Sequence, residues 1–194
     1  MPGVLRAQAA PIRIGFPVPL TGPYGTEAAG QVRCAQIAVA EWNEAGGLGG
    51  RMAELLVRDD KLDPGEATTR ALELIERDQV NVIVGSLSAS VQLAVNNVCK
   101  QRGVPFNSIS QSDQITALPD WGPTTFHEAM TPHLTAGTVG RHAFGKYGKR
   151  VVFLRADYAY GQEMVAGFRA VGTAWGSKSW PTSSTRSAPR TTPR

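Results

Sequence analysis

Residues 79–113, QVNVIVGSLSASVQLAVNNVCKQRGVPFNSISQSD, decide the fold, because an apolar run stops at a serine-rich loop twice in succession. Val80–Val84 is short and rich in β-branched residues, which predicts a strand buried on both faces. After Ser90, apolar residues recur at helical spacing up to Gly103, which suits a left-handed C-cap. Val104–Ile109 is then predicted as the next strand.

The same alternation extends toward the amino terminus. Asp63-Pro64-Gly65-Glu66 predicts a helix start, with an N-cap Asp, Pro at the first helical position and an acid two residues later. Strands that alternate with helices predict an α/β fold, a parallel sheet flanked by helices. The predicted elements are a strand at Ile12–Val18, a helix at Glu27–Ala45 with a buried stripe ending at Trp42, and short strands at Glu54–Val57 and Thr124–Phe126.

A further unit follows a loosened stretch after Ile115. Thr131-Pro132 predicts a helix start, Val151–Leu154 a strand, and Gln162–Val171 a helix after the aromatic loop Asp157-Tyr158-Ala159-Tyr160-Gly161. From Gly172 to Arg194 no apolar period is present, which predicts a non-native or disordered tail.

The charge of the chain supports separating that tail. Of 20 Lys plus Arg, four lie in residues 172–194, which leaves 16 basic residues against 16 acidic ones in the remainder. A neutral body with scattered arginines forms no basic stripe, so nucleic acid is not expected as a partner. We interpret the tail as the product of a reading-frame slip near Ala174, a hypothesis that sequencing of the locus tests.

The amino terminus resembles a signal-peptide cleavage site, and the two cysteines have no metal-type spacing. Ala7-Gln8-Ala9 has small residues where a signal peptidase reads, so residues 1–11 are interpreted as the remnant of a secretory signal, with an ordinary ragged terminus as the alternative. Cys34 and Cys99 lie in separate predicted helices without metal-type spacing. We expect two buried, unpaired thiols.

The serine loops, residues 85–90 and 108–113, carry the expected binding function. In open parallel sheets, loops at the carboxyl ends of strands line a crevice, and helix N-termini there present free N–H groups. Both loops are rich in hydroxyl groups and nearly uncharged, which favours a small polar ligand over a phosphate. Single serines in such loops also serve as turn and cap residues, and that alternative stays open for each of them.

Other chemistries find little support. Gly46-Gly47-Leu48-Gly49-Gly50 follows a helix and is interpreted as a turn instead of a dinucleotide fingerprint. No G-x-S-x-G elbow is present, so no hydrolase is expected. Asp59-Asp60 is interpreted as a solvated strand end or cap. His127, Glu128, His133 and His142 lack metal-site spacing, so we predict no metal, no cofactor and no enzymatic activity.

Five segments together carry a family resemblance. IRIGFPVPLTGPYGTEAAGQ, AVAEWNEAGGLGG, LLVRDDKLDPGEATTRALELIERDQVNVIVGSLSAS, RGVPFNSISQSD and FLRADYAYGQEM resemble the periplasmic leucine/isoleucine/valine-binding proteins, type I substrate-binding components of ABC transporters. The resemblance covers Ile12 to Val171 and implies two α/β lobes that close over a ligand. It places the first lobe at residues 12–126 and the start of an incomplete second lobe at 131–171. The chain thus resembles the amino-terminal part of such a protein.

The resemblance also implies the site. The loop containing Ser88, Ala89 and Ser90 matches the loop that holds a ligand carboxylate, with Ala89 at the position that most often supplies a hydroxyl group. Ser110 and Ser112 match residues that reach the α-ammonium and carboxylate groups. Tyr160 matches a second-lobe tyrosine at the cleft. The acid that pairs with the ammonium in amino-acid binders would lie past Val171, where the chain has no acid.

The expected function is capture of a small carboxylate-bearing solute, such as a branched-chain amino acid, in an interlobe cleft in the periplasm. The implied partners are that ligand and the membrane permease of an ABC transporter. The alternative is a cytoplasmic ligand sensor of the same fold, of amide or amino-acid type, that regulates transcription. A basic start and an apolar run before Ala7 would distinguish transport from sensing.

Overall fold

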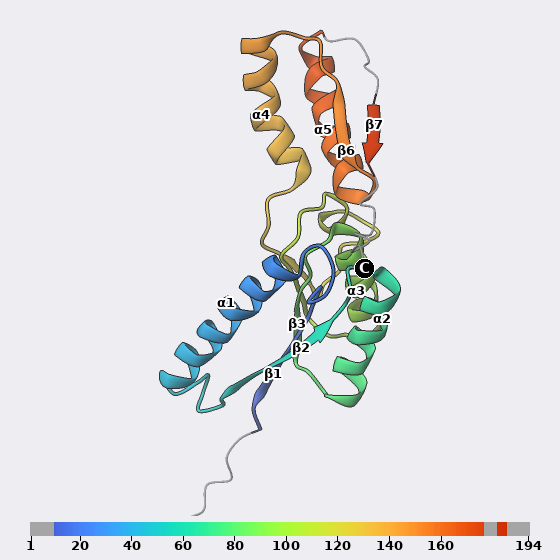
Figure 1. Cartoon of the computed structure of the whole chain (residues 1–194). Helices are drawn as coiled ribbons and strands as arrows, with labels where there is room; N and C mark the ends of the chain where they lie inside the picture. The colour runs from blue at the N-terminus through green and yellow to red at the C-terminus, as the bar shows by residue number, and fades with distance from the viewer. Residues whose placement is uncertain (1–9, 177–181, 186–194) are drawn as a thin grey trace, which may run out of the picture.

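The structure is a computed structural model and describes residues 10–176 and 182–185. A parallel sheet of five strands, in the order β2-β1-β3-β4-β5, forms the centre of the larger part (Figure 1). The predicted class, an α/β fold with a parallel sheet flanked by helices, is confirmed. The strands are β1 (Ile12–Val18), β2 (Ala53–Asp59), β3 (Val82–Gly85), β4 (Phe106–Ser108) and β5 (Thr125–His127).

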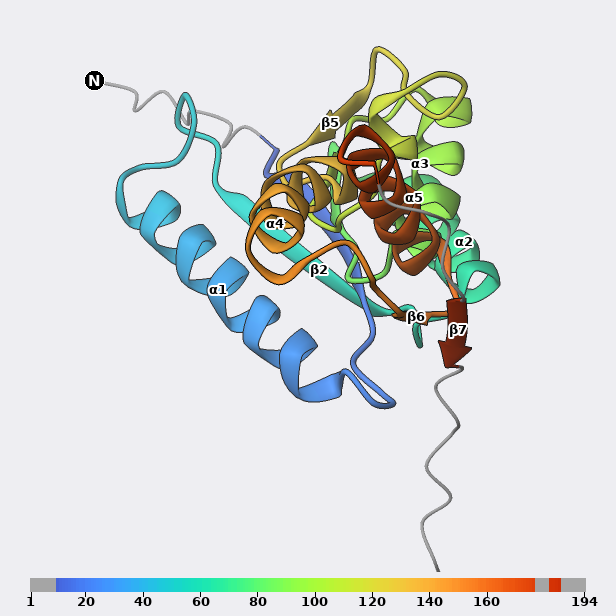
Figure 2. The same ribbon diagram turned by 90° about the horizontal axis from the view of Figure 1, so that it is seen from above.

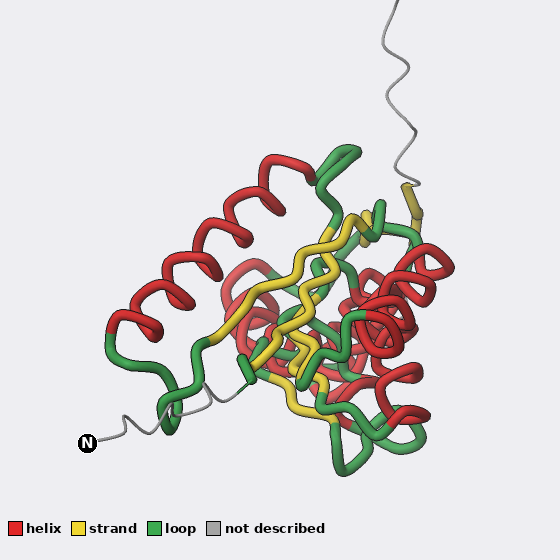
Figure 3. Tube along the Cα trace, turned by 90° about the horizontal axis from the view of Figure 1, so that it is seen from below, coloured by secondary structure: helices red, strands yellow, loops and turns green. Residues whose placement is uncertain are grey.

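Helices cover both faces of this sheet. Helix α1 (Gly25–Glu44) lies on one face, as the view from above shows (Figure 2). On the other face lie α2 (Pro64–Leu72), continued by the π-turn η1 (Glu73–Arg77), and α3 (Ala89–Arg102). Figure 3 shows the strands running between these two helical layers. This layering follows from strands that are apolar on both sides, because each face must be shielded from water.

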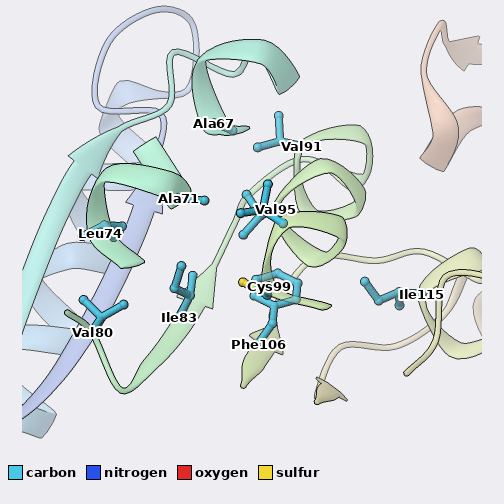
Figure 4. Close-up of a cluster of buried hydrophobic side chains, with 11 residues drawn as sticks. Ala67, Ala71, Leu74, Val80, Ile83, Val91, Val95, Cys99, Phe106 and Ile115 are labelled. Carbon is cyan, nitrogen blue, oxygen red and sulfur yellow. The ribbon is translucent and has the colours of Figure 1, made fainter. Parts of the chain in front are cut away.

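The main hydrophobic core lies between the sheet and the α2–α3 layer (Figure 4). The helices contribute small or β-branched residues, and the strands contribute Ile83 and Phe106, both fully buried. Close packing of this kind stabilises the domain through apolar burial. The core residues are Ala67, Ala71, Leu74, Val80, Ile83, Val91, Val95, Val98, Cys99, Phe106 and Ile115.

Three helix ends form as the sequence predicts. Asp63 Oδ1 accepts a hydrogen bond from Glu66 N at 2.8 Å, with Pro64 as the first helical residue. Gly103 ends α3 in the left-handed conformation, with φ of 67°. Thr131 Oγ1 accepts a hydrogen bond from Leu134 N at 3.3 Å and begins α4 (Pro132–Tyr147). Local side-chain and backbone chemistry therefore sets these boundaries.

Helix α1 is less buried than its apolar stripe predicts. Ala28 is fully buried, and Val32 and Ala35 pack against the cluster of Phe16 and Val18. Trp42, expected in the core, is 37% exposed, so that expectation is wrong. The reason is that α1 packs mainly along β2, which is an edge strand of the sheet.

The cysteines are both unpaired, as expected. Cys99 is buried in the main core on α3, whereas Cys34 is exposed on α1, which corrects the expectation that both thiols are buried. The two helices lie on opposite faces of the sheet, which keeps the thiols apart (Figure 2).

A second, smaller unit stands beyond the carboxyl ends of the strands (Figure 1). It contains α4, β6 (Phe153–Ala156), α5 (Ala159–Ala174) and β7 (Thr182–Thr185), with β6 and β7 paired in parallel. Helices α4 and α5 pack closely because small residues face each other. A Cβ atom added at Gly167 would lie 2.8 Å from Ala136 Cβ.

Regular structure continues into the segment expected to be a tail. Helix α5 reaches Ala174, and the strand Thr182–Thr185 lies within that segment. The interpretation of residues 172–194 as a non-native or disordered tail stays a prediction. Residues 1–9, 177–181 and 186–194 lie outside the described residues, so the signal remnant and the frame slip stay predictions.

Candidate functional site

A cavity of about 250 Å³ lies where two loops, one between β3 and α3 and one between β4 and the 3₁₀ turn η2 (Gln114–Thr116), meet the start of α5. Its walls come from both units of the chain, and none of the described residues that line it is charged. The lining residues are Leu87, Ala89, Ile109, Ser110, Gln111, Tyr158 and Tyr160.

The β3–α3 loop presents the N-terminus of α3 to this cavity. Ser88 is the N-cap residue, and its side chain makes no capping hydrogen bond. Ala89, the first helical residue, lines the cavity directly. The first N–H groups of a helix lack intrahelical partners and carry a partial positive charge. This end of α3 therefore favours an anionic group in the cavity.

Ser110 joins the two loops of the first wall. Its Oγ donates a hydrogen bond to the carbonyl oxygen of Leu87 at 2.9 Å, across the loops that follow β3 and β4. The residue is 8% exposed and lines the cavity. A hydroxyl group also accepts hydrogen bonds, so Ser110 offers a ligand an acceptor while its own proton holds the wall together.

The opposite wall is aromatic. Tyr158 is the N-cap residue of α5, and Tyr160 lies in its first turn, with ring centroids 6.3 Å apart and planes inclined by 28°. Burial raises the pKa of the Tyr158 phenol, and the neighbouring phenols of Tyr24 and Tyr160 raise it further. The raised pKa keeps the Tyr158 phenol neutral at neutral pH, so Tyr158 offers the cavity a ring and a hydroxyl group instead of a charge.

The site residues named from the sequence fall into two groups. Ala89, Ser110 and Tyr160 line the cavity together. Ser88 and Ser90 flank Ala89 without being part of the lining. Ser112 is fully buried, and its hydroxyl donates to Glu163 Oε1 at 3.0 Å, away from the cavity lining.

Sequence reasoning did not assign four lining residues, Leu87, Ile109, Gln111 and Tyr158. Each of them is adjacent, or next but one, to a residue that was named. The signal available in the sequence was the aromatic loop Asp157–Gly161, which contains Tyr158.

The histidines form no metal site in the described part of the chain. No group of three His, Cys, Asp or Glu side chains there is placed to hold an ion. His127 instead places Nδ1 3.0 Å from Ser108 Oγ, behind the β4 strand end. Burial lowers the pKa of His127, which favours its neutral form.

Comparison with known proteins finds a matching family and similar sequences. The family model described as "Periplasmic binding protein" matches residues 11–187. A curated relative, "Leu/Ile/Val-binding protein homolog 7" of Brucella abortus (strain 2308), is 35% identical over 117 residues, covering 58% of this chain and 29% of that protein.

Two solved structures show the same fold. A periplasmic binding protein from Burkholderia mallei has a TM-score of 0.85 and 25% identity, covering 92% of this chain and 48% of that one. A solute binding protein of an ABC transporter from Rhodopseudomonas palustris BisB5, in complex with 3,4-dihydroxy benzoic acid, has a TM-score of 0.75 and 25% identity, with coverages of 91% and 46%. The chain thus spans about half the length of these structures.

The match to the family model extends through both units described above, from residue 11 to residue 187. Across residues 10–176 and 182–185, each helix is too short or too polar to cross a bilayer. The matched family consists of binding proteins and not enzymes, which confirms the expectation of a non-enzymatic chain. The chain belongs to the periplasmic binding protein family.

Proposed function

We propose that this chain binds a small carboxylate-bearing solute in the cavity between its two units, as part of a periplasmic solute-binding protein that serves an ABC transporter permease. The observation that carries the proposal is the cavity itself, which is uncharged and open to the N-terminus of α3 on one side and to two tyrosines on the other. In this proposal, residues 12–126 form the first ligand-binding lobe and residues 131–171 begin the second.

The ligand's carboxylate lies at the N-terminus of α3 in this proposal. The free N–H groups at this helix end, near Ala89, are its donors, and the Ser110 hydroxyl turns its proton from the carbonyl oxygen of Leu87 to the carboxylate when the ligand binds. A cavity of about 250 Å³ is at the small end for ligand sites, which fits a molecule the size of an amino acid or a benzoate.

The organic part of the ligand lies against Tyr158 and Tyr160. Paired rings favour an aromatic or branched apolar group through stacking and apolar burial. None of the described residues that line the cavity is acidic. The two rings therefore favour an aromatic acid as the ligand. The relative bound to 3,4-dihydroxy benzoic acid supports the same choice.

The transport role is preferred to transcriptional sensing. The R. palustris neighbour is described as a solute binding protein of an ABC transporter, and the Brucella relative as a Leu/Ile/Val-binding protein homologue. No sequence or structural feature favours the sensor in the same way.

An NMR titration of the ¹⁵N-labelled 194-residue chain tests the proposal. Benzoate, 3,4-dihydroxybenzoate and isoleucine are added separately, and the amides of Ala89 and Ser110 are followed. We expect saturable shifts at both amides with the aromatic acids. Absence of a saturable shift at either amide with all three compounds would reject the proposal.

Variants then test the two walls. Ser110→Ala leaves a buried charged partner short of a hydrogen bond and should weaken binding by about 1–3 kcal/mol. Tyr160→Ala removes one ring and should weaken binding of the aromatic acids more than that of isoleucine. Thr138→Ala, on the exposed side of α4, is the control and should leave affinity unchanged.

A further inference from the structure

The carboxylate of Glu163, on α5, is bound by donors of the turn at residues 112–114. Its Oε1 accepts hydrogen bonds from Ser112 Oγ at 3.0 Å and from Gln114 N at 3.3 Å. Its Oε2 accepts from Asp113 N at 3.0 Å. Both oxygens are therefore held by the first unit, although Glu163 belongs to the second.

A second carboxylate crosses between the units in the opposite direction. Asp113, from the same turn, accepts a hydrogen bond at Oδ1 from the His133 amide, at 3.0 Å. His133 lies in the first turn of α4, so this carboxylate satisfies a helix amide that has no intrahelical partner. The turn thus contacts both helices of the second unit.

These contacts lie directly beside the ligand cavity. Ser112 follows Gln111, which lines the cavity, and Glu163 lies one helical turn after Tyr160 on α5. The interunit contact therefore connects the polar wall of the cavity to its aromatic wall. Glu163 itself is not one of the residues that line the cavity.

The single proton of the Ser112 hydroxyl is used by this contact. The hydroxyl donates to Glu163 and accepts a hydrogen bond from Gln114 N at 3.1 Å, and the residue is fully buried. A ligand carboxylate would have to displace Glu163 to reach it. Hydrogen bonds to a carboxylate are among the stronger ones in proteins, so this displacement is costly.

We propose that Glu163 is a positioning residue that latches the second unit onto the turn at residues 112–114 and thereby sets the distance between the cavity walls. The effect on ligand affinity rests on the proposed function, whereas the latch itself does not. Ser112 then serves the latch, and the ligand carboxylate is bound at the N-terminus of α3 and by Ser110.

Glu163→Gln tests the latch, because it keeps the shape of the side chain and replaces one acceptor oxygen with an NH₂ group that faces a donor. Glu41→Gln, which removes an exposed carboxylate from α1, is the control for the change in charge. In E163Q, hydrogen exchange at the Asp113 and Gln114 amides should be about tenfold faster or more. Exchange at Ile83 and Phe106 in the core should not change, and E41Q should match the unmodified chain.

Two further measurements separate positioning from simple stability. Residual dipolar couplings should fit the structure as one body in the unmodified chain and in E41Q, but require independent orientation of the two units in E163Q. Affinity for 3,4-dihydroxybenzoate should fall about fivefold or more in E163Q. Ser112→Ala should cost less affinity in the E163Q background than in the unmodified chain, because the two side chains act as a pair.

The outcomes distinguish the two proposals. Unchanged exchange at Asp113 and Gln114, or couplings that still fit one body in E163Q, would overturn the latch. Unchanged affinity together with faster exchange would overturn its role in positioning the cavity walls. If the unmodified chain binds none of the acids, the proposed function fails, while exchange and couplings still decide whether Glu163 joins the units.

Discussion

Asp60 gives the most direct test of the electrostatics of this fold. It follows β2 and is fully buried, which corrects the expectation of a solvated strand end. Its Oδ1 accepts a hydrogen bond from Leu62 N at 2.9 Å, and within the described residues its Oδ2 is without a partner. Burial raises the pKa of Asp60 to about 6, the Leu62 amide opposes this, and the charge of Asp59 adds to it.

The size and sign of the effect follow from this pKa. Folding raises the pKa of the Asp60 carboxyl from 3.8 to about 6, which is equivalent to about 2–3 kcal/mol in the free energy of unfolding. Because the folded-state pKa is raised, the cost of ionising Asp60 is fully present above pH 6 and absent below pH 3.8. Asp60 therefore makes the chain less stable as pH rises through this window.

The perturbation is Asp60→Asn, which keeps an acceptor for Leu62 N and removes the titration. Urea unfolding followed by circular dichroism, at several pH values from 4 to 8, gives the free energy of unfolding of both proteins. Other carboxyl groups titrate in both proteins, so the difference between the two curves isolates Asp60. The free energy of unfolding of D60N minus that of the unmodified chain should rise by about 2–3 kcal/mol from the acidic to the alkaline end of this pH range.

The unpaired NH₂ group of the new asparagine adds a constant, independent of pH, to the difference in free energy of unfolding between the two proteins. The slope of the difference, and not its absolute value, is therefore the quantity to test. Parallel stability curves for the two proteins would refute the reasoning, since they would mean that Asp60 has the same pKa folded and unfolded. A ¹³C titration of the Asp60 carboxyl gives the folded-state pKa independently.

Two further predictions concern the core. Leu74→Ala, at a fully buried position of the main core, should lower the free energy of unfolding by about 3 kcal/mol. Leu118→Ala, at a position 80% exposed, should change it little. Equal effects of the two variants in urea unfolding would contradict the assigned core. Burial raises the pKa of the Cys99 thiol to about 12, so a thiol reagent at pH 8 should label only Cys34 quickly in the folded chain. Cys34→Ser should abolish that rapid phase, and rapid labelling of two thiols would show that the α3 side of the core is open.

Local sequence patterns predicted most elements of the first unit correctly. The Asp63 N-cap, the Gly103 C-cap and the Thr131-Pro132 helix start depend on the chemistry of a few neighbouring residues, and each forms as expected. The buried strand at residues 82–85 follows from its run of β-branched residues. The serine loops after successive strands also lie at the edge of the sheet where the cavity is found.

Burial along α1 and the structure after Val171 could not be predicted in the same way. The apolar stripe that includes Trp42 identifies a face of α1 but not whether another element covers it. The strand Thr182–Thr185 has no apolar period that would predict it. It pairs with β6, and that pairing is seen only in the tertiary structure. Both features depend on what lies opposite in space, which a local pattern does not contain.

The sequence by itself determined the α/β class, the family resemblance and the two loops that line the cavity, because strand period, helix caps and loop composition are local properties. Tertiary structure alone decided how the serines divide between roles. Ser110 faces the cavity, while Ser112, two residues further on, is bound by Glu163 from the second unit. The physical reason is that a serine hydroxyl serves whichever partner lies within hydrogen-bond distance, and the partner of Ser112 lies fifty-one residues away in the chain.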